Sequence, residues 1–133
     1  MSQENVRVGS PVIQRWFWAF ENDTSAFEAV LHPEIEWFPL DENYGRLHGI
    51  EAALRNGAEW FDAWEEHQTD VGEVAAEGDS VILVVHIVAR GRTSGAEVDV
   101  RFYPHFKLRD DKVVYIYDYT DRAEALAAVS LED

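Results

Sequence analysis

The clearest pattern in the chain lies at residues 97–121, EVDVRFYPHFKLRDDKVVYIYDYTD. Two runs of alternating apolar and polar residues meet at the polar segment 109–112, which is typical of a tight turn. Alternate side chains of a strand point to the same face. One face of the first run is therefore apolar and comprises Val98, Val100, Phe102, Pro104, Phe106 and Leu108. The stretch predicts an antiparallel hairpin with one dry face.

Asp118 is the unusual residue of this hairpin. It shares its parity with Val114, Ile116 and Thr120, which otherwise indicate a buried face. A carboxyl group among core residues has to be neutral, hydrogen-bonded or functional. Asp118 is therefore the first candidate for chemistry.

The neighbouring segments extend the hairpin into a sheet. Strand-like runs at 69–76 and 81–90 precede those at 97–109 and 112–120. The segments between them, 77–80, 91–95 and 109–112, are short and rich in turn residues. We therefore expect four consecutive strands that pair antiparallel as a meander.

Helical spacing dominates the first half of the chain. Ser10 and Pro11 indicate the start of a first helix that ends near residue 21. A second, short helix is expected to begin at Asp23 or Thr24 and to end before Pro33. A strand at 35–40, a loop at 41–48 and a third helix from 49 to 64 follow, and a last helix is expected at 121–129.

The composition limits the classes of partner. The 133 residues fit one domain, 1–133, and the net charge of -15 would repel nucleic acids and anionic membranes. The chain has no cysteine and no membrane-length apolar stretch, which favours a cytoplasmic protein. It shows no paired metal-ligand spacing, no glycine-rich phosphate loop and no dinucleotide fingerprint, so we expect no metal and no cofactor.

Four phrases of the sequence resemble one family. They are the segments WFWAFEND at 16–23, HPEIEW at 32–37, HGIEA at 48–52 and DKVVYIYDYTD at 111–121. Together with the order of elements, they resemble the nuclear transport factor 2-like superfamily, and in particular its SnoaL-like polyketide cyclase branch. The resemblance implies an α+β, cone-shaped (cystatin-like) fold, in which N-terminal helices pack on a strongly curved antiparallel sheet around a small-molecule pocket.

The same resemblance implies several possible activities. The superfamily includes polyketide cyclases, ketosteroid isomerases, dehydratases, epoxide hydrolases and proteins that only bind ligands. The isomerases carry a carboxylate base where this chain has Trp37, which argues against their chemistry. Asp118 resembles the last Asp of the epoxide hydrolases, but His86 and Val88 stand nearest to their other two catalytic positions.

His86 and Asp118 form the candidate catalytic pair. If the strand at 81–90 turns His86 toward the concave face, the two side chains can meet, and Asp118 would act as a base with His86 as its helper. Alternation does not fix this register, because both faces of the strand are apolar. The alternatives are a buried structural hydrogen bond or a His86 that faces outward to a dimer partner. Asp121 is a regular acidic position in the family, but its place before a helix favours an N-cap.

Aromatic side chains supply the candidate pocket lining. Trp18 falls off the apolar stripe of the first helix and is expected in the pocket or at an interface. The expected ligand is a small hydrophobic or cyclic molecule. The residues expected to bind it are Trp16, Trp18, Trp37, Tyr44, Trp60, Phe102, Phe106 and Ile116.

The convex face of the sheet is expected to form a homodimer. In the register that points His86 inward, this face carries Val81, Leu83, Val85, Ile87, Tyr103, Tyr115 and Tyr117. The leading function is cofactor-free acid–base chemistry of the cyclase, dehydratase or hydrolase kind. The alternatives are a small-ligand-binding protein without catalysis and an interaction module that uses the sheet face.

Overall fold

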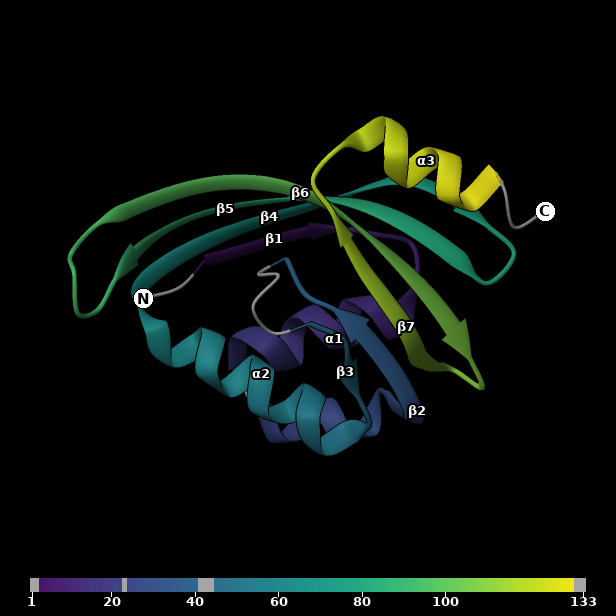
Figure 1. Cartoon of the computed structure of the whole chain (residues 1–133), viewed down its shortest axis with the longest axis horizontal. Helices are drawn as coiled ribbons and strands as arrows, with labels where there is room; N and C mark the ends of the chain where they lie inside the picture. The colour runs from purple at the N-terminus through teal and green to yellow at the C-terminus, as the bar shows by residue number, and fades with distance from the viewer. Residues whose placement is uncertain (1–2, 23, 41–44, 131–133) are drawn as a thin grey trace.

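A single curved sheet forms the framework of the molecule (Figure 1). The computed structural model describes residues 3–22, 24–40 and 45–130. In this part of the chain the strands are β1 Gln3–Arg7, β2 Leu31–Phe38, β3 Leu47–His48, β4 Trp64–Glu77, β5 Ser80–Gly91, β6 Glu97–Arg109 and β7 Lys112–Tyr119. They lie side by side in the order β1-β4-β5-β6-β7-β2-β3.

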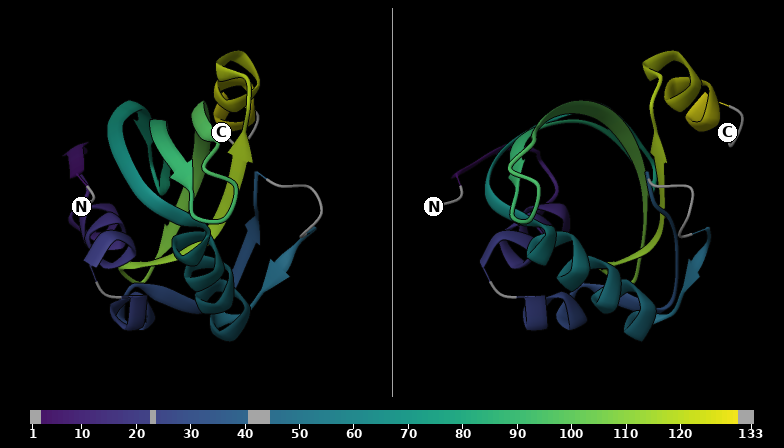
Figure 2. Two further views of the ribbon diagram at one scale, coloured as in Figure 1. Left: turned by 90° about the vertical axis from the view of Figure 1, so that its left-hand side faces the viewer. Right: turned by 60° about the vertical axis from the view of Figure 1, so that its left-hand side comes forward.

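The helices lie on both sides of the sheet. They are α1 Pro11–Asn22, the 3₁₀ helix η1 Thr24–Ala29, α2 Ile50–Ala63 and α3 Arg122–Ser130. In Figure 2 the sheet arches over α1 and α2, and α3 lies outside the arch. Ile13, Trp16 and Phe17 of α1 belong to the main core together with Phe106 of β6. This arrangement confirms the predicted α+β cone.

The hairpin of β6 and β7 forms as predicted. Asp110 and Asp111 both have positive φ angles, 54° and 60°, as a two-residue hairpin loop of type I′ requires. Asp tolerates this left-handed conformation better than most residues. β4, β5, β6 and β7 pair antiparallel in sequence order, which confirms the meander.

Two strands were not predicted, and two others begin earlier than predicted. β1 was not predicted, and it pairs parallel with β4. β3 lies within the segment predicted to be a loop, and β4 begins at Trp64 directly after α2 rather than at Thr69. β2 begins before Pro33, because an irregularity in its pairing with β7 between Leu31 and Glu36 accommodates a residue without an N–H.

The faces of β5 are the reverse of the register that would point His86 inward. Val85 pairs with Phe102, and Ile87 pairs with Val100, so these four side chains share one face of the sheet. That face is the concave one, because Val85, Ile87, Val100 and Phe102 all line the internal cavity described below. The predicted convex apolar surface of Val81, Leu83, Val85 and Ile87 is therefore wrong.

The last helix covers part of the convex face. Ala125 and Val129 of α3 form a second buried cluster with Ile82 of β5, and Tyr103 and Tyr119 pack against it. Among the described helices, none is long and apolar enough to cross a membrane.

Candidate functional site

The concave face of the sheet and the helices α1 and α2 enclose a cavity of about 420 Å³. This volume falls in the range that holds small organic ligands. The lining is mostly apolar and aromatic, with Asn56, Glu59, Thr69 and Asp118 as its polar side chains. The full lining comprises Trp16, Phe17, Trp37, Pro39, Leu40, Asn56, Glu59, Ala63, Trp64, Thr69, Val85, Ile87, Val98, Val100, Phe102, Pro104, Phe106, Ile116 and Asp118.

Asp118 is held in this lining by two donors from the β2 side. The indole Nε1 of Trp37 donates to Oδ2 of Asp118 at 3.3 Å, and the backbone N–H of Leu40 donates to the same oxygen at 3.1 Å. Leu40 follows the end of β2, so its N–H bonds to the side chain rather than to a strand. Within the described residues, no donor reaches the other oxygen, Oδ1. Oδ1 is therefore the atom that remains for a ligand.

The environment of Asp118 changes its acidity. Burial raises the pKa of the Asp118 carboxyl from 3.8 to about 7, although the hydrogen bonds from Trp37 and Leu40 lower it. Because both donors point at Oδ2, the proton of the neutral form belongs on Oδ1. Near neutral pH the group can therefore donate a proton or accept one at the same atom, which is what acid–base catalysis needs.

An aromatic cluster fixes the orientation of Trp37. Trp16 of α1 makes edge contacts with Trp37, with ring centroids 5.3 Å apart, and with Phe106, at 5.5 Å. These three side chains are buried. Since such pairs resist rotation of either ring, α1 holds the indole N–H toward Asp118.

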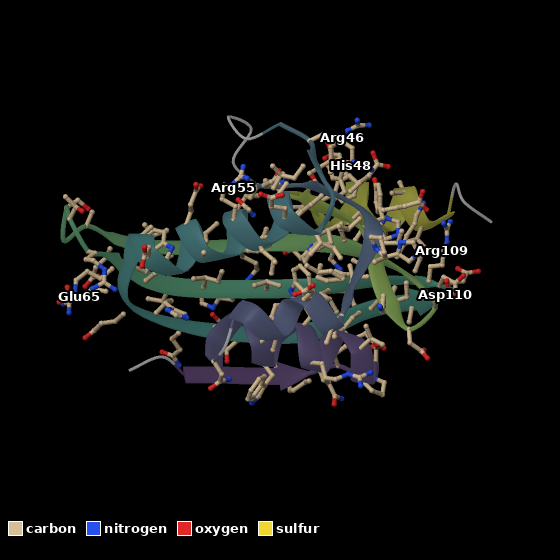
Figure 3. The ribbon with its side chains drawn as sticks, turned by 90° about the horizontal axis from the view of Figure 1, so that it is seen from below. Arg46, His48, Arg55, Glu65, Arg109 and Asp110 are labelled. Carbon is tan, nitrogen blue, oxygen red and sulfur yellow. The ribbon has the colours of Figure 1, made fainter. Side chains whose placement is uncertain are left out.

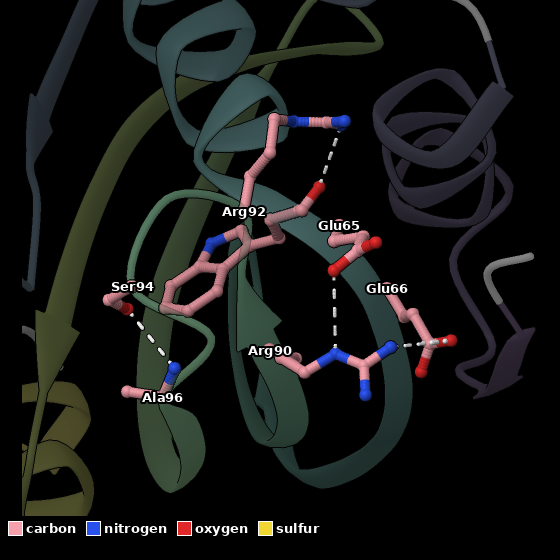
Figure 4. Close-up of polar contacts among 7 residues, drawn as sticks. Glu65, Glu66, Arg90, Arg92, Ser94 and Ala96 are labelled. Carbon is pink, nitrogen blue, oxygen red and sulfur yellow. Dashed lines mark hydrogen bonds and ion pairs between the residues drawn. The ribbon is translucent and has the colours of Figure 1, made fainter.

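The polar edge of the cavity comes from α2. Asn56, Glu59 and Ala63 recur at helical spacing and line the cavity together. Arg92 anchors the C-terminal end of this helix, because its side chain donates to the carbonyl oxygens of Asp62 and Trp64, both at 3.1 Å. Figure 4 shows Arg92 reaching a carbonyl oxygen beside the ion pairs of Arg90 with Glu65 and Glu66.

His86 lies on the other face of β5, apart from the cavity. Its neighbours in the strand, Val85 and Ile87, line the cavity, while the Nε2 atom of His86 lies 2.6 Å from the exposed Asp99 carboxylate. The expected pairing of His86 with Asp118 is therefore wrong. His86 instead faces outward, with Asp99 as its neighbour.

The structure places the other expected site residues as follows. Trp16, Trp37, Phe102, Phe106 and Ile116 line the cavity with Asp118. Trp18 is 53% exposed and is not part of the lining. Tyr44 and the side chain of Trp60 lie outside the described residues.

Asp121 takes the structural role expected from its place before a helix. Its Oδ1 accepts hydrogen bonds from the backbone N–H groups of Ala123 and Glu124, at 2.7 and 3.3 Å. These are N-cap bonds for α3.

Part of the site was not predicted from the sequence. The register that points His86 inward puts Val85 and Ile87 on the convex face, and neither Asn56 nor Glu59 was a candidate, yet all four line the cavity. The helical spacing of Asn56 and Glu59 beside the apolar stripe of α2 is a signal that could have found them. The N–H of Leu40 carries no such signal, because it is a backbone group.

The described residues offer no metal centre. Among them, no group of three or more His, Asp or Glu side chains is arranged to hold a metal ion. The aromatic lining and the carboxyl group of Asp118 therefore define the candidate chemistry of this cavity.

Comparisons with known proteins agree with the fold. The family model of the SnoaL-like domain matches residues 13–116. A protein from Jannaschia sp. CCS1, described as a candidate SnoaL-like polyketide cyclase, superimposes with a TM-score of 0.72 at 21% identity, over 93% of this chain and 97% of the other. No curated protein gives a significant match.

Two further solved structures contain small molecules. A protein of ketosteroid isomerase-like fold from Catenulispora acidiphila DSM 44928, in complex with trimethylamine, has a TM-score of 0.72 at 15% identity, over 90% of this chain and 92% of that one. TerC, co-crystallised with polyporic acid, has a TM-score of 0.69 at 18% identity, over 90% and 95% of the two chains. At these identities the likeness concerns the fold alone.

Proposed function

The chain belongs to the SnoaL-like domain family, and we propose that it is a small-molecule enzyme that uses cofactor-free acid–base chemistry on a hydrophobic or cyclic ligand. Asp118 is the proposed acid–base group. The observation that carries this proposal is one carboxyl group, with a pKa of about 7, in the wall of an apolar cavity. Two solved structures of this fold contain a small molecule, which supports a ligand-binding role.

The proposed step is a proton transfer at Oδ1 of Asp118. Above pH 7 the carboxylate removes a proton from a C–H or O–H group of the ligand, and it returns this proton to another atom of the same ligand. Trp37 and Leu40 hold Oδ2, so the carboxyl group keeps its orientation while Oδ1 exchanges the proton. Cyclisation, dehydration and ring opening all need such a transfer.

A non-catalytic binding protein is the second candidate. It is favoured by the position of His86, which removes the expected partner of Asp118 from the cavity. Glu59 is then the other titratable side chain of the described lining. The two candidates make different predictions for turnover but the same prediction for ligand binding.

Ligand binding in the cavity is tested first. A library of small cyclic compounds is screened by tryptophan fluorescence against the wild type and the Val98→Phe variant, which narrows the cavity from β6. Ala127→Phe is the control, because Ala127 is exposed on α3 and outside the lining. We expect hits that Val98→Phe loses and Ala127→Phe keeps. Hits that both variants keep, or no hits at all, would contradict a role for the cavity.

Turnover is tested on the hits. Each compound is incubated with the wild type and with Asp118→Asn, and the products are followed by mass spectrometry. Conversion by the wild type that falls at least 100-fold in Asp118→Asn, while binding persists, is the result expected of an enzyme. Binding without conversion in either protein would favour the non-catalytic candidate.

We further propose that the convex face of the sheet forms a homodimer. Val88 and Tyr117 are large apolar groups exposed on this face, at 40% and 36%, and Phe38 packs against Tyr117 with ring centroids 5.2 Å apart. A two-fold contact would cover such a surface with its own copy. Light scattering should give twice the chain mass, and Tyr117→Glu should shift it toward the monomer. A monomeric wild type at micromolar concentration would overturn this proposal.

A further inference from the structure

The described lining of the cavity contains carboxyl groups but no basic side chain. The sequence contains 11 Lys and Arg residues and five His residues, and none of them belongs to the lining of the cavity. The titratable side chains of the lining are the carboxyl groups of Asp118 and Glu59. No Lys, Arg or His stands at a position whose side chain the structure leaves undescribed. The ionisable groups of the lining itself are therefore acidic, and the buried imidazole on this face of β4 is that of His67, which is not part of the lining.

The cationic side chains lie at the periphery. Figure 3 shows Arg46, Arg55 and Arg109 at the outer edges of the molecule. Arg46 pairs with Glu36 at 2.9 Å, and Arg55 lies 3.6 Å from Glu51, both with more than half of the Arg side chain exposed. These surface pairs offer no counter-charge inside the cone.

The cavity also has the aromatic faces that attract a cation. Trp16, Trp37, Phe102 and Phe106 surround it together with Asp118. An ammonium group is stabilised by aromatic rings, most strongly by Trp, and more so when water is excluded. Oδ1 of Asp118 receives no donor from the described residues and so can accept the N–H of an amine.

We propose that the ligand of this cavity is an organic ammonium ion, that is, a protonated amine on a compact apolar group, with Asp118 as its counter-ion. This inference rests on the proposed function, because it names the ligand class of the same site. The ionised carboxyl group of Asp118 disfavours an anionic ligand, since like charges repel more strongly where water is excluded. The net charge of -15 also raises the local concentration of cations.

Ionisation of Asp118 sets the expected pH dependence. Besides Asp118, the titratable side chain of the described lining is Glu59 from α2, and His67 is buried on the same face of β4 as Thr69. The lining from α1, β2, β5 and β6 is apolar or aromatic. An ammonium ion binds the ionised carboxylate, and burial raises the pKa of Asp118 to about 7. Between pH 8 and pH 6 the ionised fraction of the free protein falls about tenfold, so the affinity for the ion should fall about tenfold.

The test compares two probes of the same shape. Binding of 1-adamantanamine, which is protonated at pH 8, and of neutral 1-adamantanol is measured by isothermal titration calorimetry. The proteins are the wild type, Asp118→Asn and Asp79→Asn. Asp79 is an exposed residue in the turn between β4 and β5, so its variant removes the same charge far from the lining.

We expect the wild type and Asp79→Asn to bind the amine at least tenfold more tightly than the alcohol. Asp118→Asn should lose this preference while its affinity for the alcohol changes less than threefold. In the wild type, the amine affinity should fall about tenfold from pH 8 to pH 6, and the alcohol affinity should not.

Three outcomes would overturn the inference. The first is equal affinity for the alcohol and the amine. This result would refute the proposed ligand class but not the proposal that the cavity binds small molecules. The second is an amine preference that persists in Asp118→Asn. The third is no binding of either probe at millimolar concentration. The library screen with Val98→Phe decides the proposed function separately.

Discussion

Replacing Asp118 by Asn should make the protein more stable, and by an amount that depends on pH. Burial raises the pKa of this carboxyl from 3.8 to about 7, and each pKa unit corresponds to 1.36 kcal/mol. The ionised group therefore destabilises the folded state by at most about 4 kcal/mol. That is a large share of the stability of a typical domain. The amide oxygen of Asn can still accept the bonds from Trp37 and Leu40.

The sign follows from the order of ionisation. As the pH rises through 4, the unfolded chain loses the Asp118 proton first, so wild-type stability falls until the folded carboxyl ionises near pH 7. Below pH 4 both states are protonated and the variant has little advantage. The stability difference between Asp118→Asn and the wild type should thus grow from near zero at pH 4 to roughly 3–4 kcal/mol at pH 8, and then stay constant.

Urea denaturation followed by tryptophan fluorescence at pH 4, 5, 6, 7 and 8 measures this difference directly. Asp79→Asn serves as the control, because it makes the same substitution at an exposed turn outside the lining. A difference for Asp118→Asn that is flat across this range, or that falls with rising pH, would refute the assignment of Asp118 as a buried carboxyl with a raised pKa.

Three further substitutions probe the surroundings of the site. Trp37→Phe removes a donor that lowers the pKa of Asp118, so the carboxyl pKa should rise further, as measured by carbon NMR of the labelled side chain; an unchanged pKa would contradict the bond to Nε1. His86→Ala should change ligand affinity less than twofold and stability by about 1 kcal/mol or less, because its pair with Asp99 is exposed; a tenfold loss of affinity would return His86 to the site. Asp121→Ala should cost about 1 kcal/mol in thermal or urea unfolding, since it removes the N-cap of α3, whereas an unchanged stability would contradict the cap.

Local patterns predicted the central sheet and most of the helices. The alternation in β6, the turn at Asp110 and Asp111, and the spacing in α1 and α2 each reflect short-range preferences, and the structure follows them. β1 was missed because Gln3–Arg7 forms a strand only by pairing with residues 68–72, far along the chain. β3 is too short for any periodic signal.

The error over His86 has a definite origin. Both faces of β5 are apolar, so alternation within the strand leaves its register open. The hairpin to β6 contained the missing information. Arg90 pairs with Glu97 across the turn, which places Val88 opposite Asp99 and His86 opposite Arg101. The outward orientation of His86 therefore follows from the pairing of β5 with β6 and not from the pattern of β5 alone.

The fold alone does not account for a carboxyl group at position 118. Its two donors among the described residues, the Trp37 indole and the Leu40 N–H, need only one acceptor oxygen, and an Asn side chain would supply it without a charge. An Asp at this position instead carries a cost of up to about 4 kcal/mol once it ionises. What Asp adds is a second oxygen, Oδ1, that gains and loses a proton near neutral pH inside the cavity. We infer that this oxygen, rather than any structural bond, is the reason for an acidic residue here, and the comparison of Asp118→Asn with the wild type in stability and in ligand binding separates the two roles.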